Sequence, residues 1–127
     1  MSYSVLPDTD VRIDFFRGEE KAVTLINDNS DQIILSSIVV AELYAGVKGD
    51  QEMRILDNFI SLFRIIPVTH LIAKSGGLYK NDYGKSHGVG IADAIIAATA
   101  KLENADLLTL NLKHYPMIKN IKPAYKK

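Results

Sequence analysis

Acidic residues stand at isolated places in otherwise apolar segments of this chain. Asp8 and Asp10 follow an apolar lead-in that ends at Pro7, with one threonine between them. Glu42 lies inside IVVAELYAGV and Asp93 inside GIADAIIAATA, so each is almost the only polar group of its segment. A carboxylate in such surroundings is costly unless it is paired or binds a metal ion. These four acids are therefore candidates for a shared site.

The chemistry of such a site follows from the charges. Carboxylates that gather without a cation repel one another, and some of them are then driven to hold protons. A hard divalent cation removes this conflict, and Mg²⁺ or Mn²⁺ prefers oxygen ligands while keeping several waters. Such a cation lowers the pKa of a bound water and neutralises charge that builds on a phosphate. The acids thus suit Mg²⁺- or Mn²⁺-dependent hydrolysis of phosphodiesters.

Each candidate also has a structural interpretation that needs no metal. Asp8 and Asp10 suit helix N-caps, because a carboxylate accepts the free backbone N–H groups there. For Asp10, capping and a functional role explain the residue equally well. An N-cap is the main competitor for Asp93, whereas an exposed polar face is the weaker explanation for Glu42. Asn111 follows the apolar run DLLTL, where an asparagine is most often a turn residue.

The apolar segments alternate between strand and helix patterns. Short apolar or β-branched runs predict strands at 2–6, 32–37, 64–68 and 105–111, with a last edge strand at 121–125. Apolar residues at three- and four-residue spacing predict helices at 9–18, 19–29, 38–47, 51–63, 69–88 and 90–104. Asp14 is expected on a solvated helix face. The alternation indicates an α/β fold with a parallel sheet and helices on both of its faces.

The predicted sheet brings the candidates to one edge. Ligands of open parallel sheets bind beyond the carboxyl ends of the strands. Asp8 and Asn111 follow predicted strands, Glu42 comes about one helical turn after Ser37, and Asp93 precedes most of an alanine-rich helix. We therefore expect these residues, which are far apart in sequence, to lie together.

The composition limits the class of protein. The 127 residues fit one domain, spanning 1–127. The chain has 15 lysine and arginine residues and 15 aspartate and glutamate residues, which argues against a protein that coats nucleic acid nonspecifically. The segment beyond Asp106 contains no acid and is locally basic. The lack of cysteine excludes a thiolate zinc site and a cysteine nucleophile. No membrane span or signal peptide is recognisable, which is compatible with the cytoplasm.

Four blocks of the sequence resemble one known family. PDTDVRIDFFRG resembles the opening signature of PIN-domain proteins, which is an apolar strand, an Asp-Thr-Asn or similar triplet and a short helix ending near Arg-Gly. SSIVVAELYAGV is similar to the second block with its central glutamate, and GIADAIIAATAKLENADLLTLNLKHY to the third and fourth blocks. The resemblance spans nearly the whole chain in the right order. The length of the chain and the residues of the four blocks are most similar to those of VapC-type toxins of toxin–antitoxin pairs.

This resemblance implies a three-layer α/β/α sandwich with a central, mainly parallel sheet. It implies a Mg²⁺- or Mn²⁺-dependent endoribonuclease in which metal-activated water cleaves RNA, leaving 5′-phosphate and 3′-hydroxyl ends, with tRNA as a candidate substrate. It also implies a toxin held inactive by a cognate VapB-type antitoxin, and a homodimer.

The resemblance assigns roles to the candidates by motif. Asp8 and Asp93 would be the main metal ligands. Glu42 would complete the acidic cluster, through a bound water or by helping to activate the nucleophile, and Asn111 occupies the fourth acidic position. The residues expected to support these ligands by hydrogen bonding are Asp10, Ser37 and Thr109.

The chain also departs from the family pattern. Asn111 is an amide, so the site carries one fewer charge and the case for a second metal is weaker. His114 stands where relatives often have an acid, and Asp10 replaces the commoner Asn. Arg12 replaces a commonly aliphatic residue, which suggests pairing with an acid or contact with RNA.

Other functions remain open at this level. Metal-free ribonuclease chemistry needs histidine pairs, but His70, His87 and His114 form no paired motif. An aspartyl-phosphate mechanism suits Asp8, with Thr109 as a candidate partner, but no lysine is well placed. A PIN-domain nuclease of RNA processing that is not a toxin, or a catalytically weak module that binds through the same acidic site, are the remaining alternatives.

Overall fold

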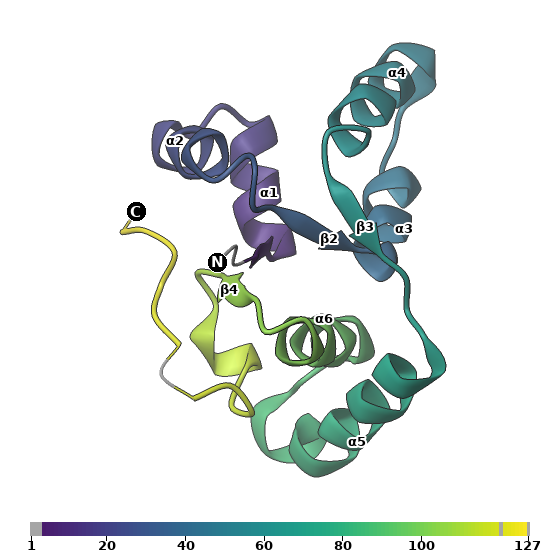
Figure 1. Cartoon of the computed structure of the whole chain (residues 1–127), viewed down its shortest axis with the longest axis vertical. Helices are drawn as coiled ribbons and strands as arrows, with labels where there is room; N and C mark the ends of the chain where they lie inside the picture. Colours follow the sequence, from purple (N-terminus) through teal and green to yellow (C-terminus); the bar gives the residue numbers. More distant parts are fainter. Residues whose placement is uncertain (1–3, 120, 127) are drawn as a thin grey trace.

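The computed structural model describes residues 4–119 and 121–126, in which short strands alternate with helices (Figure 1). The strands are β1 (Val5–Pro7), β2 (Ile34–Ser36), β3 (Arg64–Ile66) and β4 (Asp106–Leu108). The helices are α1 (Thr9–Phe16), α2 (Glu20–Asp28), α3 (Ser37–Ala45), α4 (Gly49–Ile60), α5 (His70–His87) and α6 (Ile91–Leu102), and a short 3₁₀ helix, η1 (Leu112–His114), follows β4. The six predicted helices and four of the predicted strands are confirmed within a few residues of their ends. Residues 2 and 3 of the first predicted strand lie outside the described residues.

The strands form a parallel sheet in the order β3–β2–β1–β4. β1 pairs with β4, and β2 pairs with β3, both in parallel register. A parallel bridge between Val5 and Ile33 joins the two pairs, and the backbone N–H of Val5 donates to the carbonyl of Gln32 at 2.9 Å. All four strands therefore end at the same edge of the sheet.

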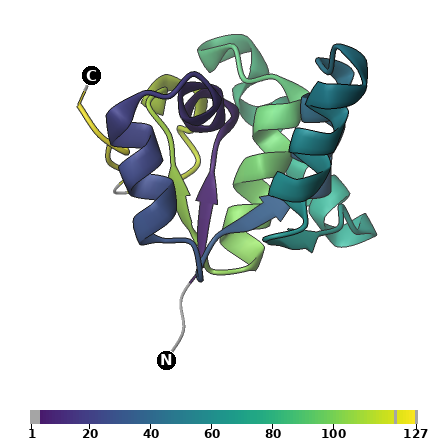
Figure 2. The ribbon, with the colours of Figure 1, turned by 90° about the horizontal axis from the view of Figure 1, so that it is seen from above.

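Helices cover both faces of the sheet, because alternate strand residues point to opposite sides. Leu6 and Ile34 belong to the apolar cluster beneath α5 and α6. Their neighbours Val5 and Leu35 belong to a second cluster with residues of α1, α2 and α4. The two layers of helices are visible on either side of the strands in Figures 1 and 2. This arrangement confirms the α/β/α sandwich.

A close contact between α5 and α6 explains a glycine in α5. A Cβ atom built on Gly76 would lie 2.9 Å from Cγ1 of Ile95 in α6. The glycine therefore allows the two helices to approach, although glycine lowers intrinsic helix propensity. This contact fixes the first half of α6, which carries Asp93.

Two expectations are wrong, one about a strand at 121–125 and one about the exposure of Asp14. Residues 121–125 form no strand; the contact there is a single bridge between Thr109 and Pro123, because a proline has no N–H to continue the ladder. Asp14 is buried rather than solvated, since the hydroxyl of Tyr125 donates to its Oδ2 at 2.5 Å. The end of the chain thus packs back against α1.

No helix among the described residues is long and apolar enough to cross a membrane.

Candidate functional site

Asp8 is the most deeply placed acid of the predicted site. It follows β1, is 5% exposed, and serves as the N-cap of α1, where its Oδ1 accepts the backbone N–H of Thr9 at 2.6 Å. Its other oxygen, Oδ2, accepts the hydroxyl of Thr109, which lies just beyond β4, at 3.0 Å. The capping and functional interpretations of Asp8 are therefore compatible, and the side chain is held from two strand ends.

Thr109 also orders the turn that follows β4. Its hydroxyl is fully buried and accepts the backbone N–H of Asn111 at 3.0 Å while it donates to Asp8. The supporting hydrogen bond that the sequence predicts from Thr109 is present.

Asp10 connects the same turn to the first turn of α1. Oδ1 of Asp10 accepts the backbone N–H of Val11 at 2.7 Å, and Oδ2 accepts the backbone N–H of Leu110 at 3.0 Å. Burial and the nearby charge of Asp8 raise the pKa of Asp10, and these backbone donors oppose the rise. Asp10 thus spans the two segments that carry Asp8 and Thr109.

Asp93 lies in the first turn of α6 and is held by two residues after β4. Its Oδ1 accepts the hydroxyl of Tyr115 at 3.3 Å, and its Oδ2 lies 2.9 Å from Nδ1 of His114. Burial and the charge of Asp8 raise the pKa of Asp93, whereas His114 lowers it. The charge of Asp8 raises the pKa of both Asp10 and Asp93, so the three aspartates lie near enough to repel one another and form one electrostatic cluster.

Glu42 lies at the rim of this cluster rather than inside it. Its side chain is exposed, so the structure agrees with an exposed polar helix face, the weaker explanation from the sequence. The apolar neighbours of Glu42 serve other contacts, because Val39 and Leu43 of α3 pack into the two cores. The link between Glu42 and the aspartates is the Thr9 hydroxyl, which donates to Glu42 Oε1 at 3.4 Å.

Asn111 contacts a histidine. Its Nδ2 lies 3.1 Å from Nδ1 of His114, the same nitrogen that pairs with Asp93. A single Nδ1 cannot donate to Asp93 and accept from Asn111 at once, so these two contacts compete. His114 therefore lies between the fourth predicted position and Asp93.

Ser37 supports the sheet edge in a different way from the prediction. Its hydroxyl accepts the backbone N–H of Val68 at 3.0 Å, which ties α3 to the segment after β3. No hydrogen bond from Ser37 to an acidic side chain occurs among the described residues.

The sequence and the architecture agree with one family of known proteins. The family model described as "PIN domain" matches residues 5–117. The chain belongs to the PIN-domain family. The predicted resemblance is thereby confirmed, and the following relatives place the chain near one branch of that family.

This PIN domain is similar to proteins named VapC. It is 40% identical over 124 residues to ribonuclease VapC19 of Mycobacterium tuberculosis, covering 94% of this chain and 98% of the relative. It shares 28% identity and a TM-score of 0.83 with a chain of a toxin–antitoxin complex from Klebsiella pneumoniae, covering 98% and 100%. With VapBC2 from Rickettsia felis, bound to a promoter DNA fragment, it shares 26% identity and a TM-score of 0.74, covering 92% and 94%.

Sequence reasoning missed two members of the PIN-domain site. Thr9 joins Glu42 to the aspartate side, and its position between Asp8 and Asp10 was the available signal. Tyr115 is fully buried, and burial together with Asp8 and Asp93 raises the pKa of its hydroxyl, which keeps it a hydrogen-bond donor. Its position directly after His114 gave no comparable signal.

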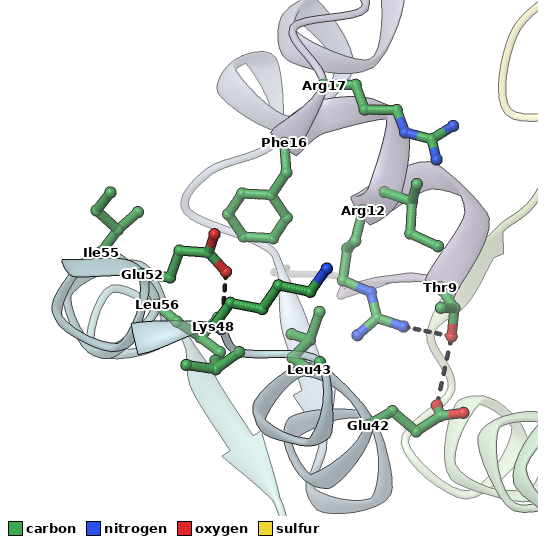
Figure 3. Close-up of a pocket in the computed structure, with 13 residues that line it drawn as sticks. Thr9, Arg12, Phe16, Arg17, Glu42, Leu43, Lys48, Glu52, Ile55 and Leu56 are labelled. Atoms are coloured by element: carbon green, nitrogen blue, oxygen red, sulfur yellow. Dashed lines mark hydrogen bonds between the residues drawn. The ribbon is translucent and has the colours of Figure 1, made fainter. Parts of the chain in front are cut away.

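A pocket of about 770 Å³ opens beside the acidic cluster of this PIN domain, between α1, α3 and α4 (Figure 3). Thr9, Arg12 and Glu42 form one polar part of its wall. The apolar part of the lining is Ile13, Phe16, Leu43, Val47, Ile55 and Leu56.

The aspartates suit a hard cation by their chemistry. Within residues 4–119 and 121–126, no three acidic or histidine side chains are grouped closely enough to hold a metal ion. Asp10 and Asp93 nevertheless have raised pKa values, in part because of Asp8, and a divalent cation would relieve that repulsion. For the aspartates to bind a divalent cation, their side chains would therefore have to rotate, and Asp93 would have to release His114.

Proposed function

We propose that this chain is a VapC-type toxin, an endoribonuclease that hydrolyses RNA phosphodiesters with Mg²⁺ or Mn²⁺ in the cytoplasm. The observation that carries the proposal is the electrostatic cluster of Asp8, Asp10 and Asp93 beyond the carboxyl ends of β1 and β4. Membership of the PIN-domain family and the similarity to ribonuclease VapC19 support it.

The residues divide the work of the proposed site. Asp8 and Asp93 would hold the cation, which when bound would acidify water and neutralise charge on the phosphate. Thr109 orients Asp8 by its hydrogen bond, and Tyr115 orients Asp93. Glu42, which is exposed at the rim, would bind the cation through a water or help to activate the attacking water by accepting its proton.

The pocket between α1, α3 and α4 is the proposed docking surface for a VapB-type antitoxin. Large apolar side chains are exposed on and beside it, including Phe16 (44%), Ile55 (55%) and Met53 (44%). Solved relatives of this chain are VapBC complexes, which supports a protein partner. Leu56 of α4 is buried, so only part of that helix face is open to a partner. A second copy of the chain, forming the homodimer expected from the family, is proposed to use another surface.

The proposal is tested by cleavage of RNA with purified protein. We expect cutting with Mg²⁺ or Mn²⁺, none in EDTA, and recovery when Mn²⁺ is added back. Asp93→Asn should abolish cutting, whereas Asp31→Asn, at an exposed position away from the site, should not. Products with cyclic phosphate ends, or cutting that persists in EDTA, would contradict the metal mechanism.

Growth after induction separates the toxin from the other PIN-domain interpretations. The wild-type chain should arrest growth, and Asp93→Asn should not. A chain that cleaves RNA in vitro without arresting growth would be a processing nuclease. If Asp93→Asn arrests growth as strongly as the wild type, the chain acts by binding.

A further inference from the structure

Arg12 is a buried cation with an unused donor. Its side chain is 0% exposed, its Nε donates to the carbonyl of Asp8 at 3.2 Å, and Nη2 donates to the Thr9 hydroxyl at 2.9 Å. Nη1 is buried and has no hydrogen-bond partner among the described residues. Burying such a donor without an acceptor is unfavourable, so the position calls for an explanation.

The guanidinium also makes no ion pair within 4.0 Å among the described residues, although Asp8, Asp10 and Glu42 lie near enough to favour its charged form. Burial lowers the pKa of Arg12 to about 10, against the opposing influence of Asp8 and Glu42, so the group stays protonated at neutral pH. The ion pairs within 4.0 Å in the described residues involve Arg64 and His114, not Arg12. A buried charge that lacks an ion pair is costly to the fold.

The guanidinium lies in the wall of a pocket but is covered in this structure, so a ligand would reach Nη1 once the side chains over it move aside. Arg12 lines the pocket between α1, α3 and α4, and in Figure 3 its planar end points toward Thr9 and Glu42 at the polar part of the wall. The same guanidinium is hydrogen-bonded to the backbone of Asp8. A ligand atom held by Arg12 would therefore lie next to the acidic cluster.

We propose that Arg12 binds a phosphodiester oxygen of the RNA strand, with its free Nη1 as donor. This inference rests on the proposed ribonuclease function. A guanidinium matches phosphate oxygens in geometry and charge, and an acceptor from the substrate would satisfy the orphaned donor.

The remaining pocket wall carries groups that suit an RNA strand, so RNA and the proposed antitoxin would compete for the same pocket. Arg17 and Lys48 line the same pocket, and together with Arg12 they outnumber the two carboxylates of its wall, Glu42 and Glu52. Phe16 is 44% exposed in the same wall, and its ring offers a stacking surface for a base. Cations combined with an aromatic surface are typical of sites for single-stranded nucleic acid.

Arg12→Met tests the inference in the Asp93→Asn background, which prevents cleavage during binding. Affinity is measured by fluorescence anisotropy with a single-stranded RNA whose 5′ end is a hydroxyl, so that phosphodiesters are the phosphates available. We expect Arg12→Met to bind the RNA about tenfold more weakly. The slope of its affinity against salt concentration should fall by about the contribution of one phosphate contact. Arg12→Lys should recover part of the salt dependence.

Two controls separate this role from a structural one. Arg64→Met removes an exposed arginine at the start of β3, at the opposite edge of the sheet, and should leave affinity unchanged. The Tm of Arg12→Met is measured beside that of the parent, because the variant loses the hydrogen bonds to Asp8 and Thr9 and its affinity counts only if it is folded. Arg12→Gln serves as a second variant if Arg12→Met unfolds.

Three results would overturn the inference. Unchanged RNA affinity in Arg12→Met and Arg12→Gln would show that Arg12 does not bind substrate. Unchanged RNA affinity with weaker binding of the antitoxin would assign Nη1 to an acceptor of the protein partner. RNA affinity that appears only when the strand carries a 5′-phosphate would assign Nη1 to the terminal phosphate rather than to a phosphodiester. Failure of the wild type to cleave RNA is a separate result, which contradicts the proposed function itself.

Discussion

Asp8 and Glu42 carry the same chemical group and were predicted for the same site, but they lie in opposite environments. Asp8 is buried between two strand ends and accepts a backbone N–H and the Thr109 hydroxyl. Glu42 is exposed on α3 and has a single long hydrogen bond from Thr9. The aspartate side is thus preorganised by the sheet, whereas the glutamate side is open to the pocket and to whatever binds there.

Alanine substitution at the two acids should give the largest difference. Asp8→Ala is expected to reduce cleavage by roughly 100- to 1,000-fold, the usual loss when one preorganised electrostatic group is removed. Glu42→Ala should cost about tenfold at most, because an exposed carboxylate is weakly preorganised. Single-turnover cleavage rates measure both, with Asp31→Ala as the exposed control. Equal losses at Asp8 and Glu42 would remove the distinction between the two sides.

Thr109→Val should weaken the ordered side without removing a ligand. The variant loses the hydrogen bond to Asp8 Oδ2, and loss of such a supporting bond typically reduces metal affinity by about 10- to 100-fold. Unfolding free energy should fall by about 1 kcal/mol because the hydroxyl is buried and bonded. Titration with Mn²⁺ and chemical denaturation measure the two effects. Thr9→Val, on the open side, is the matched comparison and should change Mn²⁺ affinity less.

The pH dependence of stability should show a smaller effect of the aspartate cluster. The folded pKa of Asp93 is raised above 3.8, so its ionisation opposes folding at neutral pH, and this penalty vanishes below the unfolded pKa. Asp93→Asn should therefore be more stable than the wild type at pH 7 in EDTA. The gain should shrink as the pH falls through the raised pKa toward 3.8. A gain that is constant with pH would not come from ionisation.

The sequence predicts the elements well where their signal is local. The β-branched run 32–37 and the alanine-rich run 90–104 became a strand and a helix, because burial patterns repeat with the period of each element. The placement of Asp8 and Asp93 near one sheet edge follows from strand order, since parallel strands end together.

Exposure depends on partners that are distant in sequence, and here prediction failed. Asp14 is covered by Tyr125, which is 111 residues away, and no local pattern carries that contact. Glu42 is exposed although its neighbours are apolar, because those neighbours pack toward two different cores. The full burial of Arg12 is equally invisible in TDVRIDFF, where an arginine usually marks a solvated face.

The pairing of β1 with β4 has a consequence for the timing of synthesis. Asp8 is translated 101 residues before Thr109, and Asp10 is translated 100 residues before Leu110, yet these later residues hold the two acids. The ordered half of the site therefore cannot assemble on a partly made chain. A nascent chain carries Asp8 and Asp10 but not their geometry until Thr109 and Leu110 have been translated, so the proposed site is not finished before then.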